Sequence, residues 1–224
     1  MKTIKLSTIV PMVFLALTGL ANASSLPNGS FESGDTFGWV ASPAEYVSIV
    51  AEATAQDGTV YYPTDGVLMA ELQAGDPFTL LYSEPFLAGP GYAITFDALF
   101  LAFDIGGYPD GMDWFLNMVI DGYSAGALAE NISNVDEVGD YGASGWMSVL
   151  VEIPEFMPTG MYTIGVAVNN FGDFDYDSFG YVDKFTIAAP QLPAAAISEP
   201  QSLALIGLGL IGILALRTST ARTQ

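Results

Sequence analysis

The segment Tyr92-Ala93-Ile94-Thr95-Phe96-Asp97-Ala98 places apolar side chains at its even positions and Ala, Thr and Asp at its odd positions. The segment Tyr162–Val168 alternates in the same way, with Tyr, Ile, Val and Val on one face and Thr, Gly and Ala on the other. A period of two residues is typical of a strand that packs one face against a second sheet. These two segments therefore predict a β-sandwich.

Short apolar runs surround these two segments, and Pro, Gly, Asn and Asp separate them. No stretch of the central part of the chain shows sustained helical spacing. The predicted strands are Tyr46–Ala51, Thr59–Tyr62, Val67–Leu72, Phe78–Tyr82, Tyr92–Phe103, Trp114–Asp121, Trp146–Ile153, Met161–Asn169 and Gly180–Ala188. This pattern predicts one all-β domain over residues 24–188, an antiparallel sandwich for which a jelly roll is the expected version.

The N-terminus has the three parts of a secretory signal peptide. Lys2 and Lys5 form a charged region, Ile9–Leu20 is an apolar stretch, and Ala21-Asn22-Ala23 is a cleavage site of small residues. We therefore expect residues 1–23 to be removed after Ala23, once the secretion translocon has exported the chain. The alternative is a buried N-terminal helix.

The C-terminus reads as a linker, a polar turn, a membrane segment and a basic tail. The Pro/Ala-rich linker Ala189–Ile197 precedes Ser198-Glu199-Pro200, and the apolar run Leu203–Leu216 precedes Arg217 and Arg222. Arginines of this kind remain on the cytoplasmic side. The apolar run would form roughly 21 Å of helix, which is short for a hydrocarbon core of about 30 Å. We expect a short transmembrane helix that a membrane protease later removes.

The segment Ser198–Leu210 resembles a PEP-CTERM sorting signal, in which Pro-Glu-Pro precedes a glycine-containing apolar segment and a basic tail. Ser198 stands where that family has its first proline, and the two arginines here are not adjacent. The resemblance implies an exosortase-type membrane protease as partner and a Gram-negative host. It also implies an inner-membrane intermediate, then the cell surface or extracellular matrix, and an association with exopolysaccharide and biofilm.

The central part of the chain is strongly acidic. Residues 24–198 carry 24 acidic side chains and one basic side chain, Lys184, so the formal charge is 24 minus 1, or −23. Nucleic-acid binding is not expected, because contacts with phosphates depend on Lys and Arg. Two explanations remain open: a salty medium that screens the charge, or divalent cations that neutralise part of it.

The chain contains neither cysteine nor histidine. This composition excludes Ser-His-Asp and Cys-His nucleophilic catalysis, and it excludes metal sites built from thiolate or imidazole. The chemistry that remains is that of carboxylates, either calcium binding or a glycosidase acid–base pair.

Two segments at the ends of the domain resemble galactose-binding-like β-sandwiches, a group that includes carbohydrate-binding modules. The opening segment is Pro27-Asn28-Gly29-Ser30-Phe31-Glu32, followed by Gly38-Trp39, and the closing strand is Gly180–Ile187. The resemblance implies that the first and last strands lie close together. It also implies that the tryptophan packs into the core.

The same resemblance implies a structural calcium ion with Glu32 and Asp183 as ligands. Backbone carbonyls would supply much of the remaining shell, because Ca²⁺ takes six to eight oxygens. Lys184 stands where a second acid or Asn is more usual, so it is a candidate partner for Glu32. The alternative is that Glu32 is an edge-strand acid in water.

Alternating acids over Asp173–Ser178 suggest a calcium loop. A calcium-hand loop requires glycine at its sixth position and glutamate at its twelfth. Those positions hold Ser178 and Lys184. The motif fails, and a solvated acidic loop is the favoured interpretation.

A second acidic loop joins two strong strands. Asp104, Asp110 and Asp113 lie in a glycine-rich stretch, and loops of this kind carry binding sites in sandwiches. As for Asp173–Ser178, a solvated acidic loop explains the composition of this stretch equally simply.

Sugar binding requires an aromatic face beside hydrogen-bonding groups. The candidate aromatic residues are Tyr61, Tyr62, Tyr82, Tyr108, Tyr123, Tyr141 and Trp146. Aromatic residues also build cores, and the sequence does not fix which of these form a platform.

These observations favour an exported, C-terminally sorted surface or matrix protein that associates with exopolysaccharide and has no enzymatic activity. One alternative is a carbohydrate-binding module with a defined glycan site. A second alternative is a small glycan hydrolase that uses two carboxylates, although no acidic residue stands in a sequence context that marks it as catalytic.

Overall fold

The computed structural model describes residues 26–75, 78–105, 110–170 and 177–190. The first of the chain's two compact units, Met1–Ala189, contains all the helices and strands of these residues. Cleavage after Ala23, the Ser198-Glu199-Pro200 motif, the Leu203–Leu216 segment and the tail arginines Arg217 and Arg222 lie outside the described residues. Within the described ranges, no helix is both long enough and apolar enough to span a membrane.

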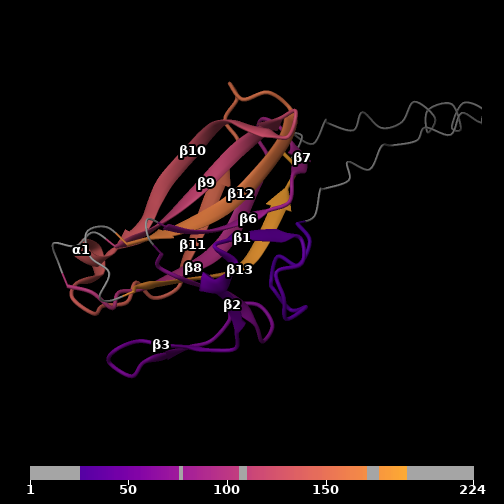
Figure 1. The fold of residues 1–224 in the computed structure, drawn as a ribbon. Helices are drawn as coiled ribbons and strands as arrows, with labels where there is room; N and C mark the ends of the chain where they lie inside the picture. The colour runs from indigo at the N-terminus through magenta and orange to yellow at the C-terminus, as the bar shows by residue number, and fades with distance from the viewer. Residues whose placement is uncertain (1–25, 76–77, 106–109, 171–176, 191–224) are drawn as a thin grey trace, which may run out of the picture. The chain divides into compact units, whose positions relative to one another are not determined.

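Thirteen strands and two short helices make up the described part of the domain (Figure 1). The strands are β1 (Trp39–Ser42), β2 (Val47–Val50), β3 (Ala53–Thr54), β4 (Val60–Tyr61), β5 (Met69–Gln73), β6 (Phe78–Ser83), β7 (Phe86–Ala88), β8 (Ala93–Leu101), β9 (Gly111–Ile120), β10 (Tyr123–Asn134), β11 (Met147–Glu152), β12 (Gly160–Asn169) and β13 (Phe179–Ala188). The helices are the 3-10 turn η1 (Ala44–Tyr46) and α1 (Val135–Val138).

The strands form an antiparallel β-sandwich, as the sequence predicted. One layer has the order β10-β9-β12-β7, and the other has the order β11-β8-β13-β5-β2. From β7 onward the chain passes repeatedly between the two layers, which is the kind of connection that a jelly roll uses. The pairs β1-β6 and β3-β4 complete the described strands.

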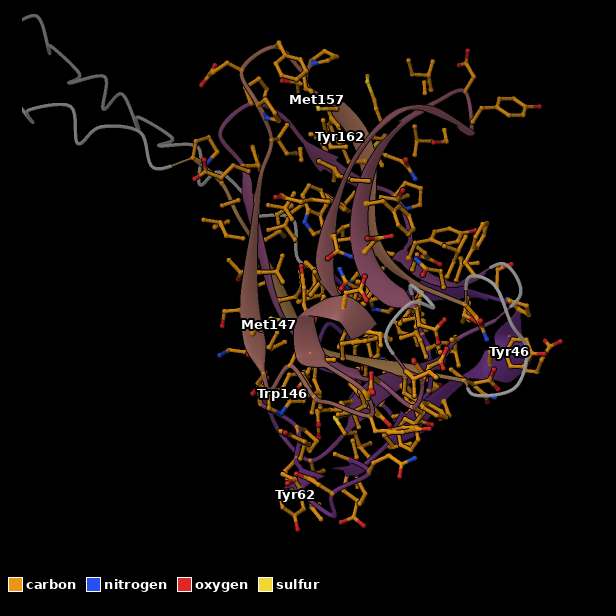
Figure 2. All side chains as sticks on the ribbon, turned by 90° about the vertical axis from the view of Figure 1, so that its left-hand side faces the viewer. Tyr46, Tyr62, Trp146, Met147, Met157 and Tyr162 are labelled. Atoms are coloured by element: carbon orange, nitrogen blue, oxygen red, sulfur yellow. The ribbon has the colours of Figure 1, made fainter. Side chains whose placement is uncertain are left out.

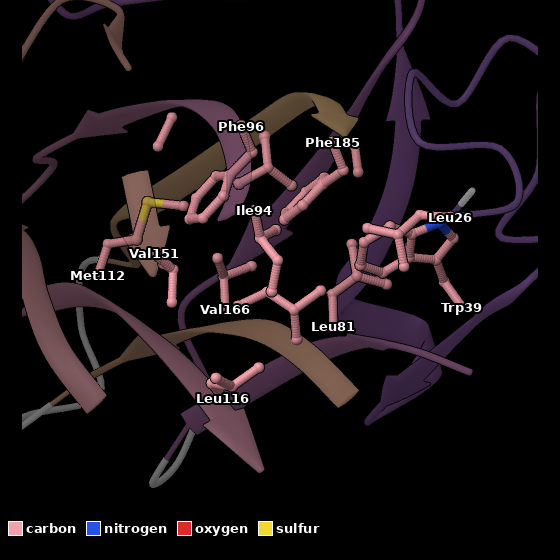
Figure 3. Packing of buried hydrophobic residues seen from close by; sticks show 14 of the residues in the cluster. Leu26, Trp39, Leu81, Ile94, Phe96, Met112, Leu116, Val151, Val166 and Phe185 are labelled. Atoms are coloured by element: carbon pink, nitrogen blue, oxygen red, sulfur yellow. The ribbon is translucent and has the colours of Figure 1, made fainter. Parts of the chain in front are cut away.

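Because side chains alternate along β8 and β12, every second residue of these strands points into the core. Inward side chains of both layers meet between the sheets, and burial of a large apolar side chain contributes about 1.5–3 kcal/mol. Figure 3 shows part of this cluster. Its labelled members are Leu26, Trp39, Leu81, Ile94, Phe96, Met112, Leu116, Val151, Val166 and Phe185.

A β-bulge interrupts β13 next to the predicted calcium ligand. The register against β8 shifts between Asp183 and Thr186, and Lys184 adopts a φ of 60°. Before the bulge the even-numbered Val182 belongs to the core, and after it the odd-numbered Phe185 does. The bulge thus brings the Phe185 ring into the core, where it stacks on Phe96 with ring centroids 4.4 Å apart.

A smaller apolar cluster covers the outer face of the five-stranded layer. Leu99 and Leu101 of β8 contact it from the sheet, and Ala53 and Ala55 contribute from the β3–β4 hairpin region. The hairpin region therefore covers the part of this outer face around Leu99 and Leu101.

Candidate functional site: a groove on the four-stranded layer

A groove of about 410 Å³ lies on the outer face of β9 and β12, with β6 and β1 along one side. We call it the sheet groove. It is lined by Val40, Leu80, Tyr82, Ser83, Glu84, Pro85, Phe115, Asn117, Val119, Gly122, Ser124 and Thr163. Its lining combines two aromatic rings with amide, hydroxyl and carboxylate groups.

Strand alternation places the lining residues of β9 on the outer face. Leu116 is fully buried in the core, so its neighbours Phe115 and Asn117 face outward. Thr163 lies directly opposite Asn117 in the register of β12 and β9. The floor of the groove thus offers an aromatic ring next to an amide and a hydroxyl group.

Tyr82 reaches the groove from β6. The backbone N–H of Ile164 donates to the Ser83 hydroxyl at 3.2 Å, which holds β6 beside β12. The Tyr82 and Phe115 rings lie 6.4 Å apart between centroids and are tilted by 55°. Two rings from strands far apart in sequence therefore share one surface.

Gly165 makes this arrangement possible. A Cβ atom at that position would lie 2.6 Å from the Leu81 carbonyl oxygen, from Phe115 Cζ and from Tyr82 Cβ. Real side chains do not tolerate such distances, so any other residue would force β6 or the Phe115 ring away. The glycine lets β6 and the two rings approach β12 closely.

Glu84 is the only acidic residue among the groove's lining residues. Hydrolysis of a glycosidic bond by the usual route needs two carboxyl groups on opposite sides of the bond. The sheet groove combines two aromatic rings with a few polar groups, a lining that can contact both the apolar and the polar parts of a ligand.

The aromatic candidates from the sequence fall into different environments. Tyr61 and Trp146 pack against the smaller apolar cluster, and the Trp146 indole N–H donates to the Tyr62 carbonyl oxygen at 2.9 Å. Figure 2 shows Tyr62 and Trp146 at the end of the domain opposite Met157 and Tyr162. The remaining candidates are Tyr82 in the groove, the exposed Tyr62, Tyr123 and Tyr141, and Tyr108, which lies outside the described residues.

Glu32 and Asp183 both contact the loop that precedes β5. Asp183 Oδ2 accepts from the backbone N–H groups of Thr64 at 2.7 Å and Asp65 at 2.8 Å. Glu32 Oε1 accepts from the N–H groups of the following residues 67 and 68, each at 2.8 Å. We call these four hydrogen bonds the carboxylate clasp.

Gly66 lies at the centre of the loop held by the clasp. It has a φ of 77°, and a Cβ atom there would collide with the Glu32 carboxyl group. The glycine therefore allows both the turn and the close approach of Glu32.

Asp183 is fully buried, and burial raises the pKa of its carboxyl group above the ordinary value. Hydrogen bonds from Asp65, Lys184 and Thr64 lower this pKa and offset part of the effect of burial. The carboxylate is therefore held by dipoles of the backbone, since the Lys184 ammonium lies 3.7 Å from Asp97 Oδ2 instead.

Calcium binding by Glu32 and Asp183 stays a prediction. Both side chains contact the loop before β5, and their carboxylate oxygens, the kind of ligand that Ca²⁺ takes, accept from backbone N–H groups there. No group of three acidic side chains suited to a metal occurs in the described part of the chain. In the clasp, both Asp183 oxygens and Glu32 Oε1 face backbone N–H donors in place of a cation.

The other acidic candidates are also separated. Asp113 accepts from the side-chain amides of Asn131 at 3.1 Å and Asn169 at 3.3 Å. Asp177 accepts from the Gln73 amide. Asp173 and Asp175 lie outside the described residues, and Asp104 and Asp110 are buried at one end of the sandwich.

The sequence did not indicate Phe115 or Asn117. Both lie in an apolar run, and a signal for Phe115 existed only in its odd position next to the core residue Leu116. The approach of β6 to β12 depends on tertiary structure, and no local pattern announces it.

No family model matches this chain, and no curated protein matches it. Among solved structures it is similar to the enzymatically active domain of bacteriophage CBA120 tailspike protein 4, with 9% identity and a TM-score of 0.46 over 74% of this chain and 21% of that one. It is similar to the CBM22-1 xylan-binding domain from Paenibacillus barcinonensis Xyn10C, with 13% identity and a TM-score of 0.43 over 76% of this chain and 97% of that one. It is also similar to CBM28, a carbohydrate-binding module specific for non-crystalline cellulose, with 16% identity and a TM-score of 0.44 over 74% of this chain and 94% of that one.

Proposed function

We propose that this domain binds a carbohydrate chain in the sheet groove and does not cleave it. The observation that carries the proposal is the pair of rings, Tyr82 and Phe115, held over Gly165 beside Asn117 and Thr163. Aromatic faces contact the apolar side of a sugar ring, while amide and hydroxyl groups bond to its hydroxyls.

The position of the groove supports this function. The β3–β4 hairpin region covers part of the opposite outer face, whereas the sheet groove is open to solvent on the four-stranded layer. An extended ligand can therefore reach the rings without any rearrangement of the fold.

The negative charge of the domain favours binding of a neutral glycan over an anionic one. The only basic residue between positions 24 and 198 is Lys184, which pairs with Asp97 and does not line the groove. An anionic polysaccharide would meet Glu84 and the strongly negative domain without a compensating cation. We therefore expect uncharged polysaccharides to bind best.

Replacing Tyr82 with alanine should lower the affinity for a neutral polysaccharide at least about tenfold, or about 1.4 kcal/mol. The measurement is affinity electrophoresis of the full chain against neutral polysaccharides that a glycan array has selected. Tyr62→Ala is the matched control, because Tyr62 is 62% exposed and does not line the groove.

Different results would contradict the location of the binding site and the carbohydrate-binding function. If Tyr82→Ala binds like the wild type, the sheet groove is not the binding site. If the wild-type chain retains no neutral glycan on the array, the carbohydrate-binding function itself is wrong.

We also propose an exported, C-terminally sorted protein that reaches the cell surface or extracellular matrix of a Gram-negative bacterium and associates with exopolysaccharide. The support is the signal peptide ending at Ala23 and the PEP-CTERM-like order of Ser198–Pro200, Leu203–Leu216 and the tail arginines. An exosortase-type membrane protease is the partner that this order implies.

Deletion of residues 200–224 should release the protein into the culture medium. The physical reason is the loss of the apolar run, without which no segment remains to hold the exported chain in the membrane. Immunoblotting of medium and membrane fractions gives the measurement, with the full chain as the control. Continued retention of the truncated protein in the membrane would contradict the sorting proposal.

A further inference from the structure

The interior of the sandwich ends in a layer of polar side chains near α1. Gly180 of β13 faces Val168 of β12 and Met112 of β9 across the core, since a Cβ atom on Gly180 would collide with Val168 and lie 3.1 Å from the Met112 sulfur. These three residues pack against one another between the sheets near this end.

Beyond Gly180, Val168 and Met112, the next inward-facing residue along each strand is polar. Alternation places Ser178, Asn170 and Asp110 on the same inward side as Gly180, Val168 and Met112. The pairing of Gly111 with Asn169 brings Asp110 and Asn170 next to each other. We call the inward polar residues of this end the end layer; they are Thr79, Asp104, Asp110, Asn170 and Ser178.

Asp104 reaches the end layer from the opposite sheet. Ala102 belongs to the main core and Phe103 to the smaller outer cluster, so alternation returns Asp104 to the core side. The Phe103 N–H donates to the Ser178 hydroxyl at 3.3 Å, which ties this segment to the start of β13. The two sheets meet at this end, because Gly75, which follows β5, forms a bridge with Asn169 of β12, and the neighbouring Ala74 N–H donates to the Ser178 carbonyl oxygen at 2.8 Å.

Several side-chain oxygen atoms of the end layer are buried and have no hydrogen-bond partner among the described residues. They are Asp104 Oδ2, Asn170 Oδ1 and Thr79 Oγ1. Asp104 is 2% exposed and Asn170 is 7% exposed, and Asp110 beside them is fully buried. A buried polar atom without a partner costs about 1–3 kcal/mol, so a group of them points to a bound species.

The charge at this site also requires a partner. Buried carboxylates are normally paired with a cation or bound to a metal. Lys184 is the only basic residue between positions 24 and 198, and its ammonium lies beside Asp97. No side chain of the domain is left to neutralise Asp104.

We propose that the end layer binds a calcium ion, with the carboxylate of Asp104 and the side-chain oxygen of Asn170 as ligands and Asp110 as a neighbouring anionic group. Calcium accepts carboxylate, amide and hydroxyl oxygens in flexible geometry, whereas magnesium demands a strict octahedron. The end layer offers such oxygens from both sheets. Bound calcium would join the two sheets at their α1 end (Figure 2 views the domain from this side).

This site is separate from the carboxylate clasp. The oxygens of Asp183 and Glu32 accept from N–H groups of the loop before β5, whereas Asp104 Oδ2 and Asn170 Oδ1 have no donor in the described part of the chain. The end layer combines carboxylates with amide and hydroxyl groups, so it is compatible with the finding that no three acidic side chains form a metal site in the described ranges.

The test is titration of the full chain, kept in mild detergent, with CaCl₂ by isothermal calorimetry, together with its melting temperature in CaCl₂ and in EDTA. We expect calcium to raise the wild-type melting temperature. Asp104→Asn should weaken the binding roughly tenfold or more, because asparagine has nearly the same shape as aspartate but lacks its negative charge. Asp121→Asn is the control, since Asp121 is exposed, and it should change the affinity less than twofold.

A second variant keeps the proposal falsifiable if Asp104→Asn does not fold. Asn170→Asp adds an anionic oxygen, so it should lower the melting temperature in EDTA and bind calcium more tightly than the wild type. Glu32→Gln should leave this response intact, which separates it from the clasp. Equal calcium affinity of Asp104→Asn and the wild type, or an Asn170→Asp protein indifferent to calcium, would overturn the proposal.

Discussion

Replacing Trp39 with alanine is expected to lower the free energy of unfolding by about 3–5 kcal/mol. The indole is 6% exposed and packs between Phe31 and Phe185, with ring centroids 5.4 Å and 4.6 Å away. Its Nε1–H donates to the Pro27 carbonyl oxygen at 3.0 Å. The substitution therefore leaves a cavity at the edge of the main core and a carbonyl without its donor.

The measurement is urea unfolding followed by circular dichroism. Phe37→Ala is the matched control, because Phe37 lies two residues away and is 69% exposed. It should change the free energy of unfolding by less than about 1 kcal/mol. Comparable losses for the two variants would mean that the aromatic cluster does not stabilise the domain as described.

Trp39 also shows what the resemblance to galactose-binding-like sandwiches could predict. The prediction that this tryptophan packs in the core is confirmed. The opening segment does lie against the last strand, where the Phe185 N–H donates to the Gly29 carbonyl oxygen at 2.8 Å. The opening segment itself forms turns, however, and the first strand begins only at Trp39.

The period of two predicted the strands whose faces differ in polarity. β8 and β12 were predicted within a few residues of their observed ends. β10 was missed, although it is the longest strand. It pairs only with β9, and small or polar residues such as Ser124 and Gly126 interrupt its apolar positions. An edge strand of this kind carries no clear alternation.

The groove could not be predicted for a different reason. It depends on the outward faces of β6, β9 and β12, which are distant in sequence and meet only in the folded domain. Apart from Asn117, β9 is apolar on both faces over Trp114–Ile120, so its period does not clearly show which side faces the core. Identification of Phe115 as a groove residue therefore needed the position of β12.

The bulge in β13 limited the prediction of the clasp. A regular strand would keep even-numbered side chains in the core to its end, but the register shift after Asp183 reverses the pattern. The sequence resemblance implied Glu32 and Asp183 as ligands of one calcium ion, which stays a prediction, whereas the hydrogen-bond donors of the Thr64–Leu68 loop could be seen only in the structure.

Replacing Asp183 with asparagine should lower the free energy of unfolding by about 2–4 kcal/mol, because the amide cannot accept all of the buried backbone hydrogen bonds that the carboxyl group accepts. Asp183 Oδ2 accepts from Thr64 and Asp65, and Oδ1 accepts from the Lys184 N–H at 2.7 Å. Whichever way the asparagine amide is turned, its NH₂ group faces at least one backbone N–H. Glu32→Gln is the comparison, and its effect should be smaller because Glu32 is exposed.

The loss of unfolding free energy caused by Asp183→Asn should also depend on pH, and its direction can be predicted. Burial raises the pKa of Asp183 in the folded state, so the folded protein binds the proton more tightly than the unfolded chain does. The stabilisation by Asp183 is then fully present below its unfolded pKa and decreases as the pH rises through the folded value. With EDTA present throughout, the stability difference between wild type and Asp183→Asn should therefore shrink from acidic toward neutral pH.

The same variant decides whether the clasp also binds calcium. If backbone N–H groups alone hold these carboxylates, calcium should raise the melting temperatures of wild type and Asp183→Asn equally, through the end layer. If Asp183 is a calcium ligand, as the sequence resemblance implies, the response of Asp183→Asn should be clearly smaller. Combining Asp183→Asn with Asp104→Asn gives the decisive comparison, because the two sites lie on different faces of the sheet and their effects should then add. A calcium response that survives in the double variant would show that neither site accounts for the binding.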